Sequence, residues 1–167
     1  MTAFISFILF CQVLGALIGA YTTIWSELAY IRAMRDGKID HAERAHLRVI
    51  AHGLRFGMVL LLISSFALVV VAYFSHSILQ PAFTSTYWTL ITFSLLVVYA
   101  SWALSRKHIS FALGSAIAFT AWWFLAYITI GWMPPLSFGG TVGFFVVATG
   151  IFYAILQYAR MLATPRR

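Results

Sequence analysis

The residues best suited to chemistry form a basic stripe at the start of an apolar segment. Successive spacings of four, four and three residues place them on one face of a helix. They are Arg44, Arg48, His52 and Arg55. Arg55 lies about 10 Å beyond Arg48 at a rise of about 1.5 Å per residue, so the stripe runs into apolar sequence. Such a face can accept an anion or, through His52, a proton.

Glu27 is the acidic residue at a comparable depth, since the other three acids follow it in a polar connection that ends at Glu43. A cation inside a membrane must pair or extend toward the headgroups. We therefore predict that Glu27 contacts Arg55 or His52 between the first two helices. The predicted ligand or ion cluster consists of Glu27, Arg48, His52 and Arg55.

Histidine also permits a haem b or a metal, and the candidate ligands are His46, His52 and His108. His46 and His52 are six residues apart and diverge by about 240° on a helix, so they cannot share one iron. A bis-histidine site would need one of them together with His108. No catalytic motif occurs: HExxH, GxSxG and a phosphate-binding glycine loop are all missing from the sequence, which argues against an enzyme.

The elements that must position these residues are membrane helices. The 167 residues are 62% hydrophobic and 9% charged, whereas soluble domains are about 45–50% apolar and about 25% charged. A hydrocarbon core about 30 Å thick needs about 20 apolar residues per helix. The sequence predicts one all-α domain, a bundle of five transmembrane helices over residues 3–32, 46–74, 85–104, 109–131 and 139–158. Gly37 is expected to end the first helix, and Asp40 with Glu43 to form a capping box for the second.

The cations predict the orientation of the bundle, because short cytoplasmic loops are enriched in Lys and Arg. They gather at the first loop, the third loop and the tail: Arg32, Arg35, Lys38, Arg44, Arg48, Arg106, Lys107, Arg160, Arg166 and Arg167. With five spans, the N-terminus is expected outside and the C-terminus in the cytoplasm. Although the net charge is +7, cations at the ends of apolar runs favour anionic headgroups as partners and argue against nucleic acid.

Small residues at four-residue spacing predict close helix packing within the membrane. The glycines concerned are Gly15, Gly19, Gly53, Gly57, Gly114, Gly139 and Gly143. We expect these faces mainly to join helices of one chain, with a homo-oligomer as the alternative. A layer of polar side chains is expected near mid-membrane, with hydroxyls bonded to their own helix or to a neighbour: Gln12, Ser64, Ser65, Ser94, Thr120 and Thr149.

Two stretches carry a resemblance to a known group of proteins. One runs from Ser26-Glu27 through residues 32–43 to His52-Gly53-Leu54-Arg55, and the other from Arg106 to Trp123. Both resemble small bacterial multi-span membrane proteins of unassigned function. The resemblance implies a bacterial cytoplasmic membrane and no particular mechanism.

These observations favour a non-enzymatic role in moving or sensing a small solute or ion, with the basic stripe as a cytoplasmic vestibule. The alternative is a structural or haem-binding electron-transfer subunit of a larger membrane complex. Minimal loops and several small-residue faces would suit such a subunit.

Overall fold

The computed structural model describes residues 2–34, 39–75, 80–134 and 136–163, and all regular structure in them is helical. The helices are α1 (Thr2–Met34), α2 (Ile39–Gly53), the π-helix η1 (Leu54–Met58), α3 (Val59–Phe74), the short 3₁₀ helix η2 (Pro81–Phe83), α4 (Ser85–Ser105), α5 (Phe111–Ile130) and α6 (Phe138–Ala163). Five stretches are long and apolar enough to cross a membrane: Ala3–Arg32, Arg44–Phe74, Ser85–Ser105, Phe111–Ile130 and Phe138–Leu162. The predicted all-α, five-span fold is confirmed.

Local signals explain where α4 and α5 begin and end. Thr84 caps α4 because its hydroxyl accepts a hydrogen bond from the Tyr87 amide, and Ser110 caps α5 by accepting from the Leu113 amide. Gly131 ends α5 with a left-handed φ of 81°, a conformation that glycine adopts at little cost. The loop with Gly37 and the side chains of Asp40 and Glu43 lie outside the described residues, so the predicted capping box stays a prediction.

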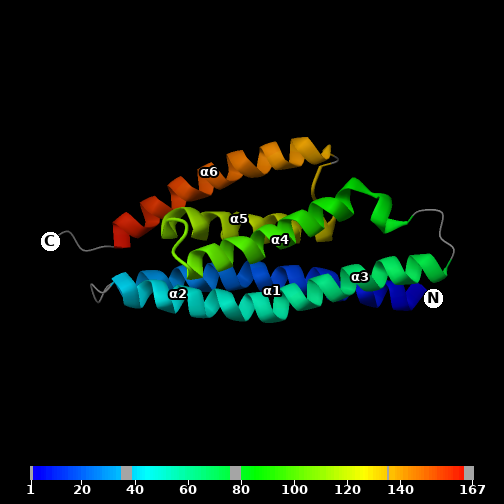
Figure 1. The fold of residues 1–167 in the computed structure, drawn as a ribbon, viewed down its shortest axis with the longest axis horizontal. Helices are drawn as coiled ribbons and strands as arrows, with labels where there is room; N and C mark the ends of the chain where they lie inside the picture. The colour runs from blue at the N-terminus through cyan, green and yellow to red at the C-terminus, as the bar shows by residue number, and fades with distance from the viewer. Residues whose placement is uncertain (1, 35–38, 76–79, 135, 164–167) are drawn as a thin grey trace.

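The helices run alternately up and down, and α6 lies along the outside of α5 (Figure 1). The chain starts at one end of the bundle and finishes at the other (Figure 1). We call the end where α1, α4 and α6 finish the basic end, because it carries Arg32, Arg106 and Arg160. Trp122 and Leu125 of α5 are buried at the centre, and α6 is the least buried span.

Glycines allow the backbone of α1 to contact that of the second span, which consists of α2, η1 and α3. A Cβ built on Gly15 would lie 2.8 Å from the Gly57 carbonyl oxygen, and one on Gly53 would lie 2.6 Å from Thr22. Gly19 faces the Trp122 ring of α5, where a Cβ would overlap the ring carbons. Gly114 of α5 packs in the same way against Leu104 and Ile109. These five glycines therefore lie at internal contacts of one chain, as expected from their spacing.

Gly139 and Gly143 differ from this expectation. Both are exposed on α6, and a Cβ at either position would meet no atom within 4 Å. Their GxxxG spacing is the same as that of Gly15 and Gly19, but the face of α6 that carries them points away from the other helices. The reason is that α6 reaches α5 along another face, through buried Thr141, Phe145 and Ala148.

The polar layer at mid-membrane is satisfied mainly inside single helices. Ser64, Ser65, Ser94 and Thr120 each donate a hydroxyl hydrogen bond to the carbonyl four residues earlier. Gln12 donates across to the Ser65 hydroxyl at 2.8 Å and links α1 to α3. The predicted hydroxyl bonding is thus confirmed at these positions, whereas the Thr149 hydroxyl has no partner in the described chain.

Candidate functional site

A buried ion pair joins the first and last spans near the basic end. The Arg160 guanidinium of α6 donates to both Glu27 carboxylate oxygens of α1, with Nη2 2.8 Å from each and Nε 3.3 Å from Oε2. The same Nη2 donates to the Ser115 hydroxyl of α5 at 2.6 Å. Glu27 is 6% exposed and Arg160 8%, so both charges are removed from lipid and water. Three helices therefore meet at one charge pair.

The guanidinium lies beside two stacked aromatic rings. Tyr30 and Phe111 stack on each other with centroids 4.5 Å apart. The Arg160 Cζ atom lies 4.9 Å from the Tyr30 centroid and 5.0 Å from the Phe111 centroid. Ring faces attract a cation within about 6 Å, and the attraction grows when water is excluded. The rings thus add to the carboxylate in stabilising the buried charge.

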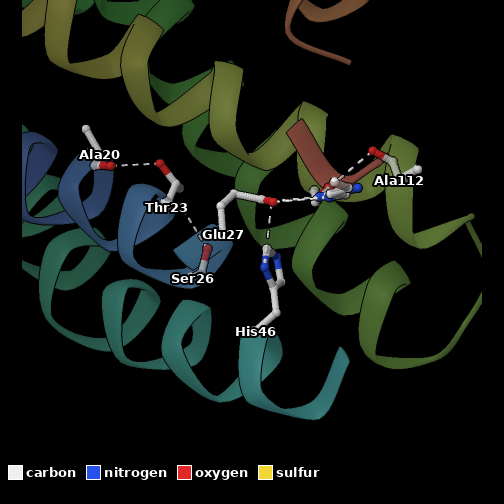
Figure 2. Close-up of polar contacts among 8 residues, drawn as sticks. Ala20, Thr23, Ser26, Glu27, His46 and Ala112 are labelled. Carbon is white, nitrogen blue, oxygen red and sulfur yellow. Dashed lines mark hydrogen bonds and ion pairs between the residues drawn. The ribbon is translucent and has the colours of Figure 1, made fainter. Parts of the chain in front are cut away.

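His46 of α2 completes the group and is 1% exposed. Its Nδ1 atom lies 3.7 Å from Glu27 Oε1, and Figure 2 shows the two side chains pointing toward each other from α2 and α1. Its ring meets Phe111 at 4.8 Å between centroids. The ring also interacts with the Ser26 backbone of α1. We call Glu27, His46, Ser115 and Arg160 the buried ion cluster.

Helical spacing on α1 places Glu27 on the buried side. Ala16, Ala20, Thr23, Glu27 and Tyr30 recur every three or four residues, and all are buried. The small side chains on this face allow α5 to pack closely. The Thr23 hydroxyl is hydrogen-bonded, because it donates to the Ala20 carbonyl (Figure 2). Glu27 follows on the same line at the level where α6 ends. Its carboxylate must therefore find a partner inside the bundle.

The predicted pairing of Glu27 with Arg55 or His52 is wrong. Both of those side chains are exposed, and neither forms an ion pair with Glu27 within the described chain. The His52 Nδ1–H donates to the Arg48 carbonyl at 2.8 Å, and Arg48 is exposed as well. The basic stripe of α2 faces outward, whereas Glu27 lies on the inner face of α1. The prediction matched these residues by their expected depth in the membrane, whereas the pairing depends on which face of each helix they occupy.

The predicted cluster lacks three members of the buried ion cluster, namely His46, Ser115 and Arg160. Arg160 was counted among the tail cations because the predicted fifth span ended at residue 158, whereas α6 continues to Ala163. His46 was considered only as a metal ligand. Tyr30, Phe111 and Ser115 surround Arg160 from α1 and α5, and no spacing within the sequence links these residues to Arg160.

The haem and metal candidates do not converge. His46 is enclosed by Phe111, Tyr30 and the Glu27 carboxylate, which leaves no open face for an axial bond. His52 and His108 are exposed, and the His108 ring lies 5.3 Å from that of Trp102. Within the described residues no three metal-binding side chains gather. The residues present thus do not fit a bis-histidine haem.

Comparison of the chain with protein-family models, with curated proteins and with solved structures finds no match. The function therefore has to be inferred from the geometry of the chain itself.

Proposed function

We propose that this five-span membrane protein conducts or transports a small ion or solute, and that the buried ion cluster is the gate at the basic end. The observation that carries the proposal is the Glu27–Arg160 pair, buried inside apolar spans and shared by α1, α5 and α6. A single charge at the bilayer centre costs at least about 2.5–3.5 kcal/mol, and ionisable residues in spans commonly mark ion pathways.

His46 favours a gate over a plain structural clamp. A clamp requires only the carboxylate and the guanidinium, which already satisfy each other. His46 adds a second titratable group 3.7 Å from the same carboxylate, and it is only 1% exposed. A histidine beside a carboxylate can exchange protons with it. The cluster can therefore change its charge pattern as an ion or proton passes.

The loose packing of α6 supports its role as the moving element. Only 17% of its span is buried, against 61% for α5. An element with few buried contacts can be displaced at a small cost in free energy. Arg160 is then the residue that holds α6 to α1, so breaking the pair would release the end of α6.

We further propose that the protein lies in a bacterial cytoplasmic membrane with its basic end in the cytoplasm, as the cation distribution indicates. Single cysteines in a Cys11→Ser background test this orientation. Cysteine at Lys107, in the exposed α4–α5 turn, is expected to react with a membrane-impermeant maleimide only after permeabilisation. Cysteine at exposed Phe83, at the opposite end, is expected to react in intact cells. The reverse pattern would overturn the orientation.

Ion flux in liposomes tests the gate. The purified protein is expected to give slow flux of protons or small ions above that of protein-free vesicles, and the Glu27→Gln/Arg160→Gln variant to raise it at least tenfold. Removing both charges opens the gate without leaving an unpaired ion. Arg106→Gln removes an exposed cation at the end of α4 and is expected to leave flux unchanged. Flux equal to that of empty vesicles in all three proteins would overturn the proposal.

A second candidate, a non-catalytic subunit of a larger membrane complex, is favoured by the open face of α6. Gly139, Gly143 and Gly150 are exposed there with no atom within 4 Å of a built Cβ. The other helical glycines named above are all in close contact. Purification from native membranes separates the candidates, because a stoichiometric complex supports the subunit and an isolated active chain supports the transporter.

A further inference from the structure

An open groove of about 740 Å³ runs along the outer seam of α1 and α2. Leu14, Ile18, Tyr21 and Trp25 form its α1 wall at helical spacing, and His52 lies on its α2 wall. The groove is lined almost entirely by apolar surface, and Trp25 and His52 lie toward its basic end. Its volume is within the range of about 300–1,000 Å³ that holds small molecules and cofactors.

Two exposed cations, Arg32 and Arg48, lie near the groove residues Trp25 and His52 without lining the groove. Because α2 runs antiparallel to α1 with Gly53 against Thr22, Arg48 lies at the level between Trp25 and Arg32. The Arg32 guanidinium carbon lies 6.0 Å from the Trp25 ring centroid. Both arginines are exposed, and neither forms an ion pair within the described residues.

Arg55 adds a third exposed cation, two helical turns deeper than Arg48. It too lacks an ion pair in the part of the chain that the structure describes. A guanidinium at the membrane boundary extends along the helix until it finds a counter-charge. The described residues supply no counter-charge to these arginines. Lipid phosphates are anions within reach, and basic sites between membrane helices are known to bind acidic headgroups.

We propose that this groove binds one anionic glycerophospholipid. One acyl chain lies against Leu14, Ile18 and Tyr21, and the phosphate faces Arg48 and Arg32. The groove offers an apolar surface for the acyl chain, and near its end lie cations that form no ion pair among the described residues. The proposal does not depend on the transport function, because the groove is on the outer face of α1 and the buried ion cluster is on its inner face.

Native mass spectrometry of the full chain, released from detergent with equal amounts of phosphatidylglycerol and phosphatidylcholine, tests the charge requirement. One phosphatidylglycerol is expected to be retained at least tenfold over phosphatidylcholine. Arg48→Gln is expected to reduce that preference about fivefold, the effect of one cation near a charged headgroup. Arg106→Gln removes an exposed cation away from the groove and is expected to leave the preference unchanged. An excess of inorganic phosphate is expected not to displace the lipid.

A steric pair tests the groove itself. Leu14→Trp fills the apolar end, and because Leu14 is half-exposed the larger ring has room without disturbing the core. It is expected to reduce retention of phosphatidylglycerol at least fivefold, whereas Leu95→Trp, at an exposed position on α4, is expected to have no effect. Equal retention of the two lipids overturns the proposal. So does an Arg106→Gln effect as large as that of Arg48→Gln, or full retention by Leu14→Trp.

Discussion

Arg160→Met is expected to lower the free energy of unfolding by about 3–5 kcal/mol, because it leaves the Glu27 carboxylate buried without a counter-charge. The variant also removes the donor to the Ser115 hydroxyl and the cation beside the stacked rings of Tyr30 and Phe111. Methionine keeps most of the length of the side chain, so the lost packing is small. Unfolding by sodium dodecyl sulfate in mixed micelles, followed by circular dichroism, measures the change.

A double-mutant cycle separates the ion pair from the surrounding packing. Adding Glu27→Gln to Arg160→Met removes the orphaned charge and is expected to recover most of the lost stability. Arg106→Gln, at an exposed cation, is expected to change stability by less than about 0.5 kcal/mol. If Arg160→Met cost no more than Arg106→Gln, or if the double variant were no more stable than Arg160→Met, the buried pair would not be holding α6.

Gly15→Val is expected to destabilise the protein by about 3 kcal/mol, the upper part of the usual range for overpacking. Its Cβ would lie 2.8 Å from the Gly57 carbonyl oxygen and 2.8 Å from the Leu61 amide nitrogen. Both atoms are backbone, so no side-chain rotation can relieve the contact and α1 must move away from α3. The same unfolding assay in micelles gives the change in stability.

Gly143→Val is the matched control, since it places the same side chain within another membrane helix. No atom lies within 4 Å of its built Cβ, so valine is expected to leave stability within about 0.5 kcal/mol of the parent. Equal losses at the two positions would mean that valine acts through helix propensity alone. A loss of co-purifying protein in Gly143→Val, with chain stability unchanged, would instead favour the subunit function.

Hydropathy predicted the five spans because each needs only length and apolar composition, and the observed ends differ by a few residues. The internal glycine contacts followed from the four-residue spacing on α1 and along the second span. The same spacing on α6 predicted packing that does not occur within the chain. Spacing defines a helix face, but it does not say whether another helix covers that face.

The buried ion cluster was only partly predictable for the same reason. Glu27 stood out as an acid in an apolar span, but its partner could not be chosen from depth alone. The basic stripe of α2 and η1 offered Arg48, His52 and Arg55 over about 10 Å of depth, and all three are exposed. The true partner lies 133 residues away in the chain. Such a contact depends on how five helices are arranged, which no local pattern encodes.

The separation of Glu27 and Arg160 bears on how the protein is made. At a synthesis rate of about 5–20 residues per second, the 133 residues between them take about 7–27 s to translate. During that interval α1 contains Glu27 while Arg160, its partner in the ion pair, has not yet been synthesised. Until Arg160 is made, the Glu27 carboxyl group lacks the guanidinium that pairs with it in the folded chain. Assembly is completed only when the arginine arrives.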